Sequence, residues 1–228
     1  MLRRLTILAL ALPACTASNS ADNPMIVLGN SALVAGTITC TFTGDVSQPT
    51  LSQGMIASQS PEPYLLTPLL QSRLTALMNQ ELTKTISIQG ADVTLSAVSA
   101  GAPALPDTSF QVLAAGFLAP NGGTANISFD LIPVTDLKAI DAALGTTPGS
   151  VIVQASIKVH GELGGDRVES EPFVYGVTVC NNCVIVNNGT CPVKTAMVRA
   201  GNPCNIFQDG AVDCCELNGV LECPGPTM

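Results

Sequence analysis

Residues 151–160 read VIVQASIKVH, and this stretch decides the fold class of the chain. Apolar residues occupy every second position, namely Val151, Val153, Ala155, Ile157 and Val159. Most positions between them are polar, namely Gln154, Ser156, Lys158 and His160. Because successive side chains of a β-strand point to opposite faces, this alternation predicts a strand that is buried on one face only.

The residues that follow predict a partner for this strand. Gly164-Gly165-Asp166 is a turn signal, and residues 167–180 then read RVESEPFVYGVTVC. The apolar side chains alternate again, at Phe173, Tyr175, Val177 and Val179. Two alternating stretches joined by a glycine turn are typical of an antiparallel hairpin. We therefore expect a long hairpin that ends at Cys180.

Further strands are predicted over residues 32–43, 85–98, 109–118, 124–131 and 184–186. The alternation in residues 85–98 changes parity at Gly90, which indicates a bulge or a tight bend. Asn121-Gly122-Gly123 predicts a turn before residues 124–131. Strands of this number and spacing predict a mainly-β fold, an antiparallel β-sandwich with an immunoglobulin-like layout. The chain contains no Trp, so the likeness to immunoglobulin domains is one of architecture only.

Two segments carry helical rather than strand periodicity. Residues 67–82 place their large apolar side chains on one helical stripe, with Thr67 as N-cap and Pro68 at the first helical position. Residues 136–144 predict a shorter helix that Gly145 caps. We expect both helices to pack on the sandwich. Docking of a partner on the leucine stripe of residues 67–82 is the alternative.

Composition narrows the class of protein. The chain has 228 residues, a formal net charge of −8 and a pI of about 4.4, which argues against a protein that binds nucleic-acid backbones. Hydrophobic residues make up 46% of the chain and the mean hydropathy is +0.40, so we expect a folded core rather than disorder. No apolar run reaches the roughly 18 residues that a membrane-spanning helix needs.

The N-terminus has the pattern of a secretory signal peptide. Arg3 and Arg4 precede the apolar run LTILALAL at residues 5–12, and Pro13-Ala14-Cys15 follows. Leu12-Pro13-Ala14-Cys15 resembles the lipobox of bacterial lipoproteins. This resemblance implies cleavage before Cys15 and attachment of a diacylglycerol to its thiol, so that Cys15 anchors the protein in a membrane. Cleavage after Ala17 or Ala21, which releases a soluble secreted protein, is the alternative.

The lipoprotein reading divides the chain into four parts. Residues 1–14 are the signal peptide, residues 15–24 the lipidated cysteine and a polar tether, residues 25–186 the sandwich and residues 187–228 a cysteine-rich tail. In lipoproteins of enteric bacteria an Asp after the lipidated cysteine tends to retain the protein in the inner membrane. Thr16 stands at this position, which favours the outer membrane if the host has one.

The remaining cysteines predict a disulfide framework, because an exported protein reaches an oxidising compartment. They are Cys40, Cys180, Cys183, Cys191, Cys204, Cys214, Cys215 and Cys223. Their even number is consistent with four disulfides, whose connectivity the sequence leaves open. Since Cys40 lies far from the others in sequence, we expect at least one bridge to tie the N-terminal region to the C-terminal region.

Cys180-Asn181-Asn182-Cys183 is a CxxC motif, for which three interpretations stand. A structural disulfide is the first. A thiol–disulfide redox site is the second, although such sites begin a helix within a βαβ unit and this motif follows a strand. A zinc site is the third, although it needs a second cysteine pair, and the adjacent Cys214 and Cys215 are poorly placed to ligate one metal together.

The usual catalytic motifs are missing. The sequence has no GxSxG, HExxH, GxxxxGK[ST] or GxGxxG motif, and its one histidine, His160, lies on the polar face of a predicted strand, where we expect it to face solvent. Asp209 and Asp213 offer carboxylates for calcium, but a turn at Asp209-Gly210 explains this stretch better. We expect no catalytic residues, no metal and no cofactor.

These observations together predict a non-enzymatic envelope protein, anchored in a membrane by lipid, that binds a partner or has a structural role. If the role is binding, we expect the partner to be a protein of the envelope. We do not expect a nucleic-acid partner. The competing hypotheses are an envelope redox protein that uses Cys180 and Cys183, and a secreted soluble binding module.

Overall fold

The computed structural model describes residues 23–32, 39–42, 45–47, 49–76, 79, 82–181, 183–192 and 199–225. Up to the helix, the elements are β1 (Met25–Ser31), β2 (Thr50–Leu51), β3 (Gly54–Ala57), β4 (Tyr64–Leu66), β5 (Pro68–Ser72), a 3-10 turn (Leu82–Lys84), β6 (Ile86–Ala97), β7 (Ser109–Leu118), β8 (Thr124–Asn126), β9 (Phe129–Ile132) and α1 (Val134–Leu144). The remaining strands are β10 (Ser150–Leu163), β11 (Asp166–Glu169), β12 (Phe173–Cys180), β13 (Ile185–Thr190), β14 (Val212–Leu217) and β15 (Val220–Glu222).

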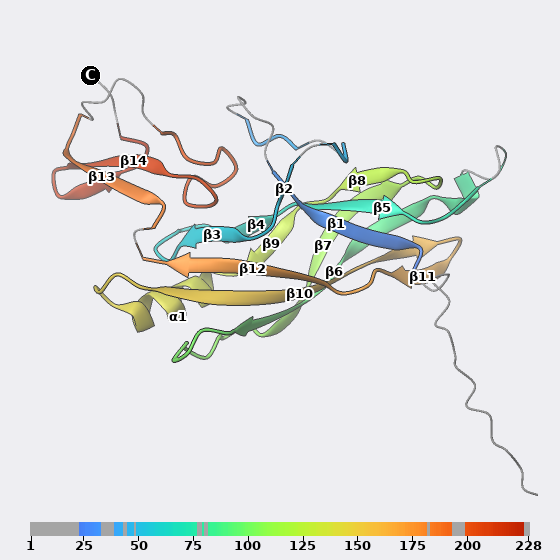
Figure 1. The fold of residues 1–228 in the computed structure, drawn as a ribbon, viewed down its shortest axis with the longest axis horizontal. Helices are drawn as coiled ribbons and strands as arrows, with labels where there is room; N and C mark the ends of the chain where they lie inside the picture. The colour runs from blue at the N-terminus through green and yellow to red at the C-terminus, as the bar shows by residue number, and fades with distance from the viewer. Residues whose placement is uncertain are drawn as a thin grey trace, which may run out of the picture.

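The expected hairpin forms the centre of the largest sheet. This sheet has the order β3-β12-β10-β6-β7, with β11 paired to β10 (Figure 1). β10 pairs antiparallel with both β12 and β6, and Val153 lies opposite Val177 on one side and Ala97 on the other. The predicted inward side chains of β10 are all buried, so the alternation in residues 151–160 identified the core face correctly.

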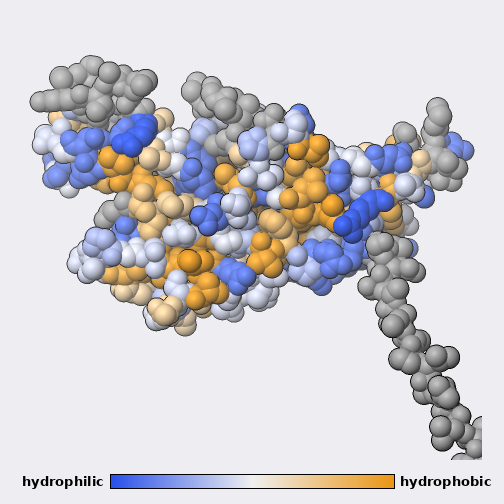
Figure 2. Space-filling model, in the orientation of Figure 1, coloured by the Kyte–Doolittle hydropathy of each residue, from blue (hydrophilic) through white to orange (hydrophobic). Residues whose placement is uncertain are grey.

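A second layer completes a sandwich-like, mainly-β fold. One sheet has the order β2-β1-β5-β8, and β4 and β9 form a separate antiparallel pair. A single hydrophobic core contains side chains from both layers, such as Met25 and Leu70 from the smaller sheet and Val93 and Ile157 from the larger. Figure 2 shows hydrophobic patches on the face in view that are separated by hydrophilic side chains.

The bulge expected at Gly90 is present, and it explains why His160 is buried. The pairing of β6 with β7 shifts register between Ile88 and Gly90, and a side-chain carbon at Gly90 would lie 2.2 Å from the carbonyl oxygen of Val112. His160 lies opposite Gly90 in β10 and is only 8% exposed. The expectation of a solvent-facing histidine is therefore wrong, because the missing side chain at Gly90 leaves room for the imidazole to pack against β6.

The N-terminal strand lies earlier in the chain than the alternation predicted. Residues 39–42 form no strand, and the rest of the predicted residues 32–43 lie outside the described part except Ala32, which follows the end of β1. The strand found is β1, which pairs with β2 and β5. Its register shifts between Val27 and Gly29, and this irregularity interrupts the period-two pattern in its sequence.

One predicted helix is confirmed and the other is wrong. α1 covers the predicted residues 136–144, buries Leu137 and Ile140, and ends at Gly145 with φ of 62°. In residues 67–82, Pro68–Ser72 instead form β5, between β1 and β8. Leu69 and Leu70 are both buried although they point to opposite faces of β5. A strand covered on both faces loses its alternation and cannot be told from a buried helix by periodicity.

The C-terminal tail forms a small sheet of its own and also packs on the sandwich. Its order is β13-β14-β15, with β13 and β14 parallel. The tail contacts the edge strand β3, where the Ala57 N–H donates to the Phe207 carbonyl at 2.9 Å and the Asp209 N–H donates to the Met55 carbonyl at 2.8 Å. In the part of the chain that the structure describes, no helix is long and apolar enough to cross a membrane.

Candidate functional site

The candidate site lies where the tail crosses the edge of the sandwich. Tyr64 of β4 and Tyr175 of β12 are the only tyrosines in the chain, and both are buried. Their hydroxyl oxygens are 3.2 Å apart. The Tyr64 hydroxyl donates to the Asp209 carboxylate at 2.8 Å. The tail thus places a carboxylate against a polar pair that belongs to two layers of the sandwich.

Each member of this tyrosine–aspartate cluster is held by a second contact. The Asn30 side-chain amide donates to the Tyr175 hydroxyl at 3.0 Å, while its carbonyl accepts from the Thr67 N–H at 2.9 Å. The Met55 N–H donates to the second carboxylate oxygen of Asp209 at 2.8 Å. A side-chain carbon at Gly54 would lie 2.3 Å from the Tyr64 hydroxyl, so the glycine is what lets the Tyr64 ring reach this position.

Burial sets the protonation behaviour of the cluster. Loss of solvent raises the pKa of Asp209, although hydrogen bonds from Met55 and Tyr64 act in the opposite direction. Burial also raises the pKa of both tyrosines, so Tyr64 stays protonated and can donate its hydrogen bond. Asp209 has φ of 51°, a conformation that non-glycine residues rarely adopt. Asp is one of the exceptions, because its short polar side chain is tolerated in this conformation in turns.

Two cavities meet at Asp209. One has a volume of about 230 Å³ and lies against Asn30, Thr67 and Asn202. The other has a volume of about 350 Å³ and lies against Gly54, Cys183 and Val184. Leu51, Asp209 and Gly210 line both, so the Asp209-Gly210 turn separates two parts of one depression between tail and sandwich.

The polar groups of the first cavity define what it can hold. The Thr67 hydroxyl is buried and has no hydrogen-bond partner among the described residues. Asp209 is the only ionisable side chain in the described lining of either cavity. A buried polar atom without a partner costs free energy, and a ligand that hydrogen-bonds to Thr67 would remove this cost. The Thr67 hydroxyl can donate or accept, whereas the carboxylate of Asp209 favours a group that donates hydrogen bonds or carries positive charge over an anion.

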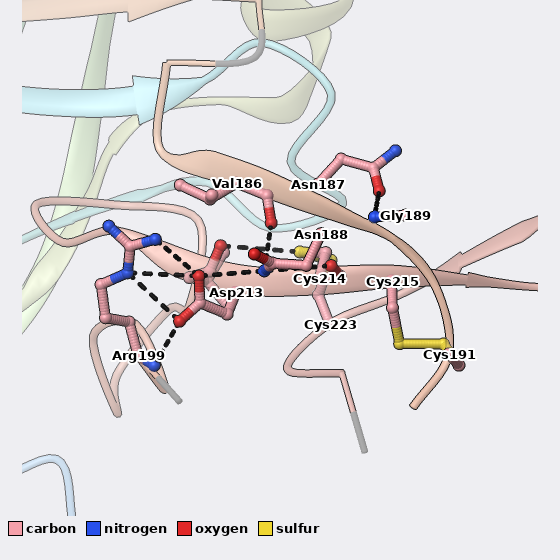
Figure 3. The surroundings of a disulfide bond; sticks show 11 residues. Val186, Asn187, Asn188, Gly189, Cys191, Arg199, Asp213, Cys214, Cys215 and Cys223 are labelled. Atoms are coloured by element: carbon pink, nitrogen blue, oxygen red, sulfur yellow. Dashed lines mark hydrogen bonds and ion pairs between the residues drawn. A yellow bond between two sulfur atoms is a disulfide. The ribbon is translucent and has the colours of Figure 1, made fainter. Parts of the chain in front are cut away.

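The eight predicted disulfide cysteines all pair. The bonds are Cys40–Cys204, Cys180–Cys183, Cys191–Cys215 and Cys214–Cys223. The first ties the N-terminal region to the tail across 164 residues, as expected. The adjacent Cys214 and Cys215 bond to different partners, and Figure 3 shows Cys215 reaching Cys191 from β14. Cys15 lies outside the described residues.

The CxxC motif lies at the end of β12, and its two cysteines form a disulfide with each other. Cys180 is buried, whereas Cys183 is exposed and lines the larger cavity beside Asp209. Many reactive thiols have a lowered pKa because they lie at a helix N-terminus, which carries partial positive charge. This motif follows a strand, and the described secondary structure around it offers no such helix N-terminus. Within the described chain, no three side chains among His, Cys, Asp and Glu are grouped so as to hold a metal ion.

Asp213 has a different environment from Asp209. Arg199 approaches it to 2.6 Å and Asn188 donates to it at 3.1 Å, as Figure 3 shows. These hydrogen bonds hold the pKa of Asp213 well below its usual range. Asp209 and Asp213 thus have separate partners, and the expected turn at Asp209-Gly210 agrees with the left-handed backbone at Asp209.

The tyrosine–aspartate cluster was not predicted from the sequence. Tyr175 was expected on the inner face of its strand, which is correct, but its hydroxyl has polar partners there. One feature of the sequence could have indicated the cluster. Both tyrosines occur in apolar stretches, and a buried tyrosine hydroxyl needs a hydrogen-bond partner. No protein-family model matches the chain, and a search of curated proteins found no match either.

Proposed function

We propose that the chain is a lipid-anchored protein of the cell envelope with a non-enzymatic role in binding or structure. The observation that carries this proposal is the joint occurrence of Leu12-Pro13-Ala14-Cys15 and four disulfides in the remainder of the chain. Disulfides of this density are typical of exported proteins. A diacylglycerol on Cys15, together with a further acyl chain on its amino group, would anchor the protein stably, since one chain alone binds only marginally.

Replacement of Cys15 tests the anchor. The Cys15→Ser variant is expected to move from the membrane fraction to the soluble fraction of the envelope or to the medium. Wild type is expected in the membrane fraction, and in the outer membrane if the host has one. A Cys15→Ser variant that stays with the membrane would contradict the anchor. Wild type in the medium would favour the secreted soluble module instead.

The binding role is proposed for the depression at Asp209. Its support is the buried Thr67 hydroxyl without a described partner, the single carboxylate and the lack of basic residues in the described lining. The ligand class is a small group with hydrogen-bond donors or positive charge and an apolar body, because Leu51 and Leu65 line the same cavity. A lysine side chain of an envelope protein has this chemistry.

Two probes of matched size test this assignment. Millimolar butylammonium is expected to raise the melting temperature of the protein, whereas butyrate of similar length is not. The stabilisation should be lost in Asp209→Asn and reduced in Thr67→Val, which keeps the shape of the side chain without the hydroxyl. It should persist in Asp166→Asn, a control at the exposed first residue of β11. An equal rise in melting temperature with butylammonium for wild type and Asp209→Asn would contradict the assignment.

A redox role for Cys180 and Cys183 is the alternative function. It is favoured by one observation, namely that Cys183 is exposed at a cavity while its partner Cys180 is buried. The reduction potential of this disulfide distinguishes the two functions. A structural bridge is expected below about −300 mV, whereas a catalytic one lies well above that value.

A further inference from the structure

The tether predicted between Cys15 and the sandwich leaves the domain at one defined end. The Arg73 N–H donates to the Pro24 carbonyl at 2.8 Å, Met25 lies opposite Ser72, and the Asn23 side chain hydrogen-bonds to Glu171. The described chain therefore begins beside the C-terminal end of β5 and near β11. In Figure 1, β11 lies at the opposite end of the molecule from the tail strands β13 and β14.

A series of contacts connects this point to exposed apolar side chains. The Asn121 N–H donates to the Leu74 carbonyl at 2.6 Å, and the Lys84 ammonium donates to the Thr75 carbonyl at 2.9 Å. Lys84 ends the 3-10 turn that begins at Leu82. β6 then begins at Ile86, and its next residue, Ser87, lies opposite Phe117 of β7.

Leu82 and Phe117 are unusually exposed for apolar residues of their size. Leu82 is 95% exposed and Phe117 is 75% exposed. Leu113 lies four residues before Phe117 on the same face of the edge strand β7 and is 90% exposed. β7 carries no charged residue, although edge strands of natural proteins commonly carry charges that prevent unwanted pairing. Other large apolar side chains are also exposed elsewhere on the domain, but Leu82 and Leu113 have the highest exposed fractions among them.

We propose that this end of the domain rests on the bilayer, with Leu82 and Phe117 inserted into the lipid interface. The inference rests on the lipid anchor proposed above. Eight residue steps separate Cys15 from Asn23, which corresponds to roughly 16 Å for a flexible chain and at most about 28 Å when fully extended. The tether thus holds this end close to the membrane surface, at an effective concentration at which a weak interfacial contact is populated.

The charges at this end do not drive the contact. Arg73 and Lys84 are basic, whereas Glu162, Asp166 and Glu171 are acidic, and Arg167 is paired with Asp92 and Glu169. The charges at this end are mixed, and the whole chain has a net charge of −8. Anionic lipid therefore does not attract the domain electrostatically. Apolar insertion is therefore the interaction that holds the domain end at the surface, and added salt should change the contact little.

The absence of Trp from the sequence allows a direct test. Four variants of the mature protein each place one Trp at an exposed position: Leu82→Trp, Phe117→Trp, Leu113→Trp and, in the tail, Val220→Trp. Val220 is 60% exposed and serves as the matched control at the far end. The proteins are isolated with their acyl chains, checked by intact mass, and inserted into phosphatidylcholine–phosphatidylglycerol vesicles with or without brominated acyl chains, which quench Trp emission on contact.

We expect brominated lipid to reduce the emission of the Leu82→Trp and Phe117→Trp variants by about twofold, that of Leu113→Trp less, and that of Val220→Trp by no more than about a tenth. Equal quenching at positions 82, 117 and 220 in the lipidated protein would overturn the contact while leaving the anchor intact. Blue-shifted emission without quenching would show that a second copy covers β7 instead. A chain without acyl mass would contradict the anchor, and with it the contact.

Discussion

The sandwich and the C-terminal tail are built by different physical means. The sandwich buries alternating apolar side chains, such as Val153, Ile157 and Val177, in one continuous core. The tail buries polar and sulfur-containing groups instead, among them Gln208, Asp213 and Cys214. Hydrophobic burial therefore stabilises the sandwich, whereas disulfides and specific hydrogen bonds determine the structure of the tail.

The disulfide between the two regions is expected to have the largest effect on stability. Cys40–Cys204 closes a loop of 164 residues, and in the chain-entropy relation its removal costs about 5 kcal/mol of unfolding free energy. Cys180–Cys183 closes a loop of three, for which the same relation gives about 2 kcal/mol. Urea unfolding of the Cys40→Ser/Cys204→Ser and Cys180→Ser/Cys183→Ser variants checks this order. Equal losses would show that loop length does not govern the effect.

A core truncation should affect the sandwich most directly. Ile157 is fully buried in β10, and Ile157→Ala is expected to cost about 2–5 kcal/mol, because it removes buried methyl groups and leaves a cavity. Urea unfolding measures this loss. The matched control is Ile152→Ala, on the outer face of the same strand, where the side chain is 46% exposed and the loss should be much smaller.

Loss of a disulfide inside the tail should remain local. Cys214–Cys223 closes nine residues between β14 and the end of the described chain, and its removal costs roughly 3 kcal/mol in the chain-entropy relation. Hydrogen exchange of the Cys214→Ser/Cys223→Ser variant should accelerate in β13 to β15 while β10 and β12 keep their protection. Acceleration in β10 to the same degree would mean that tail and sandwich unfold as one unit.

The two aspartates of the tail are expected to have the smallest effects, with opposite dependence on pH. The pKa of Asp213 is lowered by Arg199, so its contribution to stability is present above the ordinary value of 3.8 and is lost as pH falls. The pKa of Asp209 is raised by burial, so its contribution is present below 3.8 and is lost as pH rises through the raised value.

Melting temperatures at pH 3 and pH 7 check this difference. Relative to wild type, Asp213→Asn should be less stable at pH 7, and its deficit should shrink at pH 3. Asp209→Asn should gain relative stability from pH 3 to pH 7, because the amide carries no charge to desolvate. We expect shifts of no more than a few °C. The same pH trend in both variants would contradict the environments described for the two carboxylates.

The sequence predicted the regular parts of the sandwich because alternation reports burial on one face. β6, β7, β10 and α1 lie close to the expected residues, and the parity change at Gly90 correctly located a bulge. β5 was predicted as a helix because both of its faces are covered. β1 was missed because its pattern breaks at Gly29. In each wrong case the pattern depends on neighbours that are distant in sequence.

The tail and the candidate site depend even more on distant contacts. The even number of cysteines and the remote Cys40 predicted a bridge between the regions, but the partners followed only from the fold. Asp209 meets Tyr64 across 145 residues, and Thr67 lines the same cavity from the link between β4 and β5. Nothing in the local sequence around Asp209 distinguishes a buried carboxylate from one in an ordinary exposed turn.

The intact mass of the protein, taken from its native membranes and alkylated without reduction, tests the central claim most directly. The account predicts a chain that begins at Cys15, carries the added mass of acyl chains and contains no alkylated thiol. An unlipidated chain that begins after Ala17 or Ala21 would contradict the membrane anchor. Alkylated thiols at any cysteine pair would contradict the four disulfides and direct attention to Cys180 and Cys183.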